Sequence, residues 1–174
     1  MTIAECQYNM RQAYAGGATG IFASALIWFI ATIIAYFGTP TQSIIGIYVG
    51  GMFIFPLSII FSKIIGRSGV HDAKNALGKL AIETTIFMLV CFPIAYAVSI
   101  SHIEWFYPAM LGIIGGRYFI FSTIYGLKIY WLLGSTLLCS ALFLLFFGKE
   151  FYLGALTGAL IEFLFAFLVY KKSA

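Results

Sequence analysis

The chain has 174 residues, of which 62% are hydrophobic, 18% aromatic and only 9% charged, and its formal net charge is +4. Its mean hydropathy is +1.01. A soluble domain carries about 25% charged residues because its surface faces water, so this composition excludes soluble enzymes, nucleic-acid-binding modules and disordered tails. An integral membrane protein with the lipid bilayer as its partner is the class that fits, and basic cytoplasmic loops explain the positive charge.

The first 17 residues predict a separate element, a short amphipathic helix on the cytoplasmic surface. Thr2 and Glu5 have the T-x-x-E spacing of a capping box, and apolar residues then recur on one helical face. Gly16 and Gly17 are expected to end this helix. A frayed tail is the alternative. Residues 18–174 are expected to form the transmembrane domain.

Six apolar runs are long enough to cross about 30 Å of hydrocarbon, which takes about 20 helical residues. The runs are continuously apolar rather than alternating, so each is expected to be a helix and not a barrel strand. Most connections are very short, which favours an all-α polytopic membrane protein with six transmembrane helices in three antiparallel hairpins. The six predicted spans are residues 18–37, 43–62, 80–100, 106–127, 129–147 and 151–170.

Basic residues predict the orientation of these spans. Lys149 is expected on the outer side, and eight other basic residues on the inner side, so both termini are placed in the cytoplasm. Aromatic residues near both ends of the runs agree, since they prefer the membrane interfaces. Tyr14, Tyr125 and Tyr130 are among the anchors expected at the inner interface. The eight inner basic residues are Arg11, Lys63, Arg67, Lys74, Lys79, Lys128, Lys171 and Lys172.

Four pairs of glycines have the G-x-x-x-G spacing that lets membrane helices approach closely. Three of them begin the second, fourth and sixth spans, which are therefore expected to pack together in their outer halves. A pseudo-threefold arrangement of hairpins would explain the weak similarity among these spans. Two inverted three-helix halves and chance similarity are the alternatives. The pairs are Gly16/Gly20, Gly46/Gly50, Gly112/Gly116 and Gly154/Gly158.

Arg117 and Glu162 lie at nearly the same depth, near the middle of the fourth and sixth spans. A charged side chain there costs about 2.5–3.5 kcal/mol even on a lenient scale. The two are therefore expected to face inward as a direct or water-bridged ion pair, with Tyr118 or Ser122 as further hydrogen-bond partners. Such a pair suits an ion or a small anionic solute, since arginine stays charged and a buried carboxyl group takes up protons. A structural staple between helices is the alternative.

Glu83 is a further candidate site residue, one turn inside the cytoplasmic end of the third span. A salt bridge with Lys79, four residues earlier, is the alternative. His102 and Glu104 lie in an outer loop and do not make a metal site by themselves. The chain lacks the usual catalytic and phosphate-binding motifs, so neither an enzyme nor a cofactor-binding protein is expected.

A small transporter or channel-like carrier is the leading functional hypothesis, with Arg117 and Glu162 as its midplane site. A non-transporting sensor or lipid-binding scaffold, held together by the same pair, is the alternative. An intramembrane enzyme ranks last. Because the chain is short for a carrier, a homodimer or higher oligomer is a reasonable assembly.

Five stretches carry a resemblance to a known family: residues 11–17, 50–57, 77–84, 104–110 and 115–118. They resemble an uncharacterised family of small bacterial inner-membrane proteins, a domain of unknown function. The resemblance implies a bacterial cytoplasmic membrane and a compact helical bundle. It implies no activity, but it draws attention to Arg117 and to the segment from Glu104 to Pro108.

Overall fold

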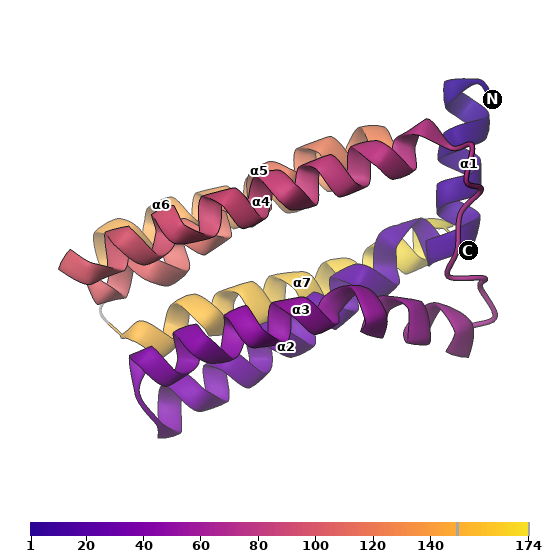
Figure 1. Ribbon diagram of the computed structural model, residues 1–174. Coiled ribbons are helices and arrows are strands. Elements are labelled where there is room, and N and C mark those ends of the chain that lie inside the picture. The colour runs from indigo at the N-terminus through magenta and orange to yellow at the C-terminus, as the bar shows by residue number, and fades with distance from the viewer. Residues whose placement is uncertain (149, 174) are drawn as a thin grey trace.

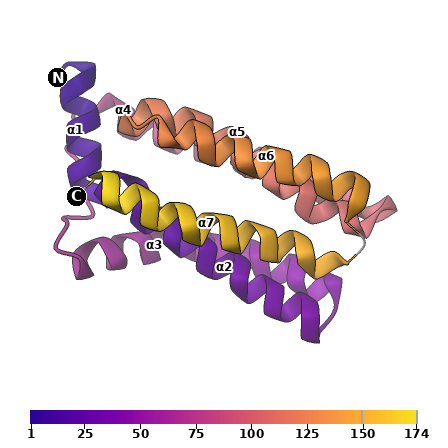
Figure 2. The same ribbon diagram turned by 180° about the vertical axis from the view of Figure 1, so that it is seen from behind.

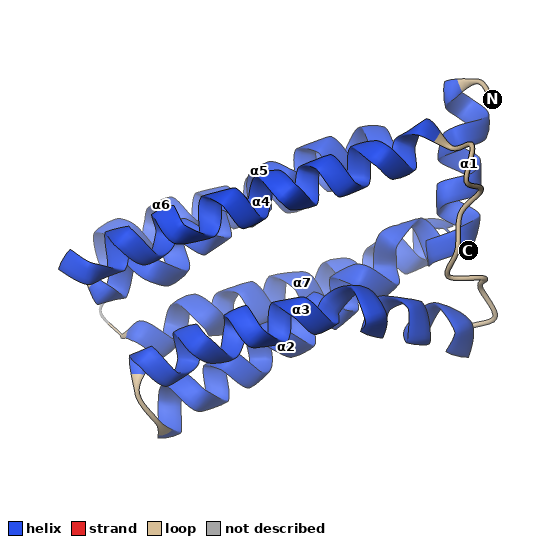
Figure 3. Cartoon of the chain, in the orientation of Figure 1, coloured by secondary structure: helices blue, strands red, loops and turns tan. Residues whose placement is uncertain are grey.

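The computed structural model describes residues 1–148 and 150–173, and these residues form helices and no strand (Figure 3). The predicted all-α class is therefore confirmed for the described residues. Lys149, the expected outer basic residue, and Ala174, the expected end of the transmembrane domain, lie outside them. The helices are α1 (Ile3–Tyr14), α2 (Ala18–Phe37), α3 (Pro40–Ile64), α4 (Ala76–Ser101), α5 (Phe106–Tyr125), α6 (Ile129–Phe147) and α7 (Phe151–Ser173), with short 3-10 turns η1 (Ala15–Gly17) and η2 (Ile103–Trp105).

Five helical stretches among the described residues are long and apolar enough to cross a membrane. They are the stretch from α1 through α2, and then α3, α4, α6 and α7. The helix α5, expected as the fourth span, is not among them, because Arg117 and its tyrosines lower the hydropathy of its 20 residues. The chain is a multi-pass membrane protein by these criteria, with five candidate spans rather than the six expected.

The six long helices form two layers of three (Figures 1 and 2). In one layer α2 packs against α3 and α7, and in the other α5 packs against α4 and α6. The helices α6 and α7 follow each other in the chain but lie in different layers. The arrangement therefore differs from three packed hairpins. The last helix, α7, packs mainly against α2, the first helix of the transmembrane domain in the sequence, and less against its neighbour α6.

The helix α1 lies across one end of both layers (Figure 1). Its predicted capping box is present: the backbone N–H of Thr2 donates to Glu5 Oε2 at 2.8 Å, and that of Glu5 donates to Thr2 Oγ1 at 3.3 Å. Ala15, Gly16 and Gly17 end the helix with positive φ angles. Glycine at position 17 is also required by packing, since a Cβ there would collide with the side chains of α5 and α6.

Polar side chains fasten α1 to the rest of the bundle. Arg11 Nη1 donates to the carbonyl oxygen of Tyr125 at 2.6 Å, and Gln7 Nε2 donates to that of Thr123 at 2.8 Å. These carbonyl groups belong to the last turn of α5. Carbonyl groups there accept no hydrogen bond from within the helix, because the helix ends before the N–H groups that would donate to them. The helix α1 therefore caps α5. It also bonds to the loop between α3 and α4, through the pairs Ala13–Gly69, Asn9–Asp72 and Cys6–Asn75.

Glycines lie at the closest approaches between helices. These approaches do not join the second, fourth and sixth spans to one another, as the glycine pairs predicted. A Cβ on Gly134 of α6 would lie 2.7 Å from the carbonyl oxygen of Gly115 of α5, so these two backbones touch. Gly50 of α3 and Gly158 of α7 both lie against side chains of α2. The expected packing of the second and sixth spans on each other is replaced by packing of both on α2.

Gly134→Ala is expected to lower the melting temperature, because the added methyl group would push α6 away from the α5 backbone. Gly51→Ala is the matched control, since nothing lies within 4 Å of a Cβ built there. Alanine is also the better helix former by about 1 kcal/mol. Circular dichroism melting in detergent compares the two variants, and equal melting temperatures would contradict the close α5–α6 contact.

Candidate functional site

Glu162 lies within α7 and has no exposed surface. Its Oε1 accepts a hydrogen bond from the hydroxyl of Tyr118 on α5, with 2.7 Å between the oxygens. Its Oε2 is equally buried and has no hydrogen-bond partner among the described residues. Ser24 of α2, also buried, lies beside the carboxyl group. A buried acceptor without a donor costs about 1–3 kcal/mol, and more when charged, which makes Glu162 the strongest candidate for a functional group.

Three tyrosines, Tyr118, Tyr125 and Tyr130, form a buried cluster between Glu162 and α1. The ring of Tyr130 stacks on that of Tyr118 with centroids 5.9 Å apart and on that of Tyr125 at 5.6 Å. The hydroxyl of Tyr130 donates to the carbonyl oxygen of Gly16 at 2.6 Å. Tyr125 and Tyr130, which were expected near the inner membrane interface, are buried in the protein because the turn at Gly16 and Gly17 packs against both rings.

Arg117 reaches α4 instead of Glu162. Its Nη2 donates to Thr85 Oγ1 at 2.7 Å, and its Nη1 lies 3.6 Å from Met88 Sδ. The guanidinium carbon lies 4.8 Å from the centroid of the Phe121 ring. No ion pair within 4.0 Å joins Arg117 and Glu162 among the described residues, so the direct form of the expected pair is not formed, and its water-bridged form stays a prediction.

The geometry of α5 explains this separation. Arg117 and Tyr118 are neighbours in the sequence and therefore point about 100° apart around the helix axis. Tyr118 contacts Glu162 of α7, whereas Arg117 contacts α4. Tyr118 is thus confirmed as a partner of Glu162. Ser122, the other expected partner, donates instead to the carbonyl oxygen of Phe119 at 2.7 Å.

A groove of about 390 Å³ lies between α4 and α5, and Arg117 is among the residues that line it. A Cβ on Gly116 would meet nothing within 4 Å, and one on Gly112 would only just reach α6. The G-x-x-x-G pair of α5 therefore leaves space along this groove rather than making a close helix contact. The walls include Thr84, Phe87 and Cys91 from α4 and Gly112, Gly116 and Arg117 from α5.

Glu83 stays apart from both groups. It is exposed on α4, and the expected salt bridge with Lys79 is not formed within 4.0 Å. In the turn after α4, His102 Nδ1 and Glu104 Oε1 are 3.3 Å apart. The part of the chain that the structure describes contains no group of three residues able to hold a metal ion.

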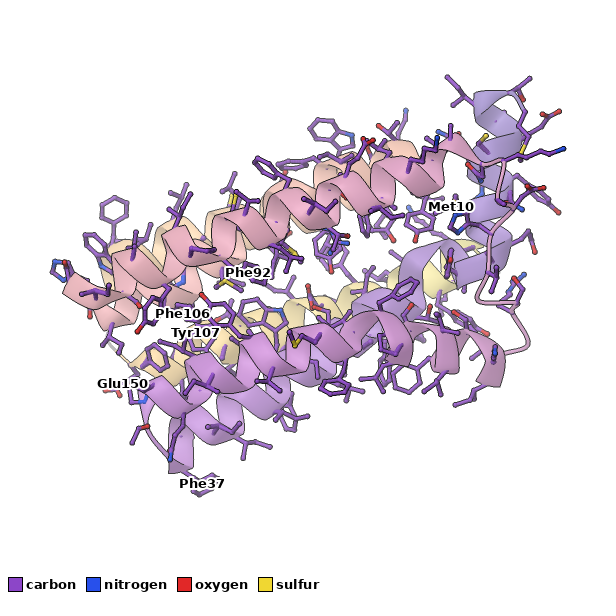
Figure 4. The ribbon with its side chains drawn as sticks, viewed as in Figure 1. Met10, Phe37, Phe92, Phe106, Tyr107 and Glu150 are labelled. Atoms are coloured by element: carbon purple, nitrogen blue, oxygen red, sulfur yellow. The ribbon has the colours of Figure 1, made fainter. Side chains whose placement is uncertain are left out.

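Side chains fill the space between the two layers. Phe92, Phe106 and Tyr107 point into it (Figure 4). The hydroxyls of Tyr107 and Ser43 hydrogen-bond to each other across the layers, and Ser43 also donates to the carbonyl oxygen of Ala31 at 2.6 Å. Sequence patterns did not single out this polar contact, because serine and tyrosine in an apolar run give no sign of the helix they will meet.

Comparison with known proteins identifies the family to which the chain belongs. A family model matches residues 3–172, nearly the whole chain. The chain belongs to DUF7010, a family of unknown function. No curated protein and no solved structure matches this DUF7010 protein. The expected resemblance to a family without a known activity is confirmed, so the function of the DUF7010 protein has to be argued from its own residues.

Tyr118→Phe is expected to lower the free energy of unfolding by about 1–3 kcal/mol, because it removes the donor to a buried carboxyl oxygen. In a Glu162→Leu background the same change is expected to cost less, since the acceptor is gone. Tyr36→Phe, at an exposed ring, is the control. Reversible unfolding in detergent–denaturant mixtures measures the double-mutant cycle, and strict additivity would rule out the Tyr118–Glu162 coupling.

Proposed function

We propose that this protein is a small ion carrier of the bacterial inner membrane and that the carboxyl group of Glu162 is its working group. The supporting observation is the buried oxygen Oε2, which has no hydrogen-bond partner among the described residues. Ionisable residues inside a membrane protein commonly mark ion or proton pathways. Because Arg117 bonds to α4 and forms no direct ion pair with Glu162, the carboxyl group suits a proton or a monovalent cation better than a small anionic solute.

The boundary between the two layers suggests how the carrier works. Glu162 belongs to the layer of α2, α3 and α7, and its partner Tyr118 belongs to the other layer. Helices pack more extensively within each layer than between layers. In the proposed cycle the layers rock against each other around this site, as the repeats of many transporters do. Rocking breaks the Tyr118–Glu162 bond and opens the carboxyl group to one side of the membrane at a time.

The proposal includes six spans with both termini in the cytoplasm, α5 being the span that hydropathy alone does not identify. A helix of 20 residues is about 30 Å long, enough to cross the hydrocarbon region. The connections before and after α5 are short, and its neighbours α4 and α6 are both candidate spans. Arg117 lowers the hydropathy of α5, but its guanidinium is bonded to α4. Charge bias in the loops supports the orientation.

A sensor or lipid-binding scaffold is the second candidate function. An open pocket lies between α1 and Asp72 of the loop after α3. Glu162 lines neither this pocket nor the groove between α4 and α5, which favours a static role for its bond to Tyr118. The helix α1 lies across the end of the bundle with Ile3 and Tyr8 exposed. Apolar side chains on such a helix insert into the membrane interface. In this function α1 responds to the lipid surface and nothing crosses the membrane.

Proton flux into proteoliposomes separates the two functions. With a trapped pH-sensitive dye and valinomycin to balance charge, the wild-type protein is expected to dissipate an imposed pH gradient. Glu162→Gln is expected to slow this at least tenfold, because it removes the group that takes up the proton. Glu150→Gln, in an exposed turn, is the control. A wild-type protein that moves neither protons, Na⁺ nor K⁺ faster than empty vesicles would leave the scaffold function standing.

Cysteine labelling tests the topology of α5. In a background with the native cysteines replaced by serine, His102→Cys is expected to react with a membrane-impermeant maleimide on intact cells. Lys128→Cys is expected to react only after the membrane is permeabilised, because the two positions flank a spanning α5. Equal labelling at both positions would show that α5 does not cross.

A further inference from the structure

Two residues of opposite charge lie on the neighbouring helices α4 and α5, namely Glu83 on α4 and Arg117 on α5. Glu83 is seven residues from the first residue of α4, and Arg117 is eight residues from the last residue of α5. These helix ends are on the same side of the membrane because η2 joins the opposite ends. At 1.5 Å per residue, the Cα atoms of the two residues lie about 10–12 Å from these helix ends. Arg117 also donates a hydrogen bond to Thr85, two residues after Glu83, so the two charges lie at similar levels along the paired helices.

Neither charge has an ion partner within the described part of the chain. The carboxylate of Glu83 is exposed on α4 and forms no salt bridge there. Arg117 bonds to neutral groups only, and its buried Nε has no hydrogen-bond partner. Charged side chains facing lipid at this depth are unfavourable unless they pair with each other or reach water. Each of the two charges therefore lacks a partner of opposite sign among the described residues of a single chain.

The groove between α4 and α5 lies beside Arg117, and Glu83 precedes one of its wall residues in the sequence. It is lined by Arg117, by Thr84 next to Glu83, and by the open faces of Gly112 and Gly116. Small residues in membrane helices mark the places where another helix approaches closely. Gly50 and Gly158 meet such a neighbour within this chain, whereas Gly116 meets none. The groove therefore has the small residues of a helix-packing surface, and no helix of this chain packs on Gly116.

We propose that a second copy of this chain occupies the groove, forming a homodimer in which Glu83 of each copy pairs with Arg117 of the other. A two-fold axis along the membrane normal brings residues of equal depth opposite each other, so both pairs form at once. Contacts of this self-complementary kind are the commonest in soluble homo-oligomers. The interface buries the open faces of Gly112 and Gly116.

Charge complementarity favours a second copy over a lipid. An anionic lipid satisfies Arg117 but leaves the carboxylate of Glu83 unpaired, and a cationic group does the reverse. A second copy supplies both signs at the depth where each is needed. The homodimer does not depend on ion transport, since Glu162 lies on α7 and lines no part of the groove.

Charge reversal tests the pairing in the full-length protein in detergent and in lipid nanodiscs. Light scattering is expected to give a dimer for the wild type. Glu83→Arg and Arg117→Glu are each expected to raise the dimer dissociation constant at least tenfold, and the double variant is expected to restore it. Helicity and melting temperature identify variants that fold. A monomeric wild type, with or without bound lipid, or a folded double variant that stays monomeric would overturn the proposal.

Native cysteines provide a second test that needs no charge change. Cys91 lines the groove, whereas Cys139 is exposed on α6. With the other two cysteines replaced by serine, a short bismaleimide is expected to cross-link two chains through Cys91 at least ten times faster than through Cys139. Cross-linking that is equal at both positions, or faster at Cys139, would place the contact elsewhere and overturn the proposal even if the charge variants fail to fold.

Discussion

The hydrogen bond from Tyr118 to Glu162 joins the two helix layers at a depth where the bilayer offers no partner for a polar group. Apolar contact between the layers gains little in lipid, because acyl chains are as apolar as leucine side chains. Close packing and polar contacts therefore hold the layers together. Ser43 and Tyr107 form another such contact, and α1 closes one end by capping α5. These bonds fix how the two layers and α1 meet.

Local features of the fold could be read from the sequence because they depend on residues close together in the chain. The predicted spans 18–37 and 129–147 coincide with α2 and α6. The helices α3 and α4 extend beyond their apolar runs, since capping residues rather than hydropathy determine where a helix begins. Thr39 with Gln42 caps α3, and Asn75 caps α4 before its apolar run. The Thr2–Glu5 capping box is a similarly local signal.

The candidate site could be predicted only in part. Counting residues along a span gives the depth of a side chain, but it does not show which neighbouring helix the side chain faces. Counting residues placed Arg117 and Glu162 at one depth, but it could not show that α4 rather than α7 flanks the arginine. That choice depends on α7 pairing with α2, a contact between distant parts of the chain. The burial of Tyr130 could not be predicted for the same reason, since the turn at Gly16 that covers it lies far away in the sequence.

The helix α5 presents different chemistry to its two sides, and this connects the proposed ion site with the proposed dimer contact. Tyr118 faces Glu162 in the other layer, whereas Arg117 lies against α4 and the groove. A second copy bound to the groove would hold α4 and α5 in place through Arg117. The layer of α2, α3 and α7 contains Glu162 and lies outside the groove. This layer would then be the one that moves when the Tyr118–Glu162 bond breaks. In a dimer of this form, the layer of α4, α5 and α6 is the fixed body and the layer of α7 is the moving one.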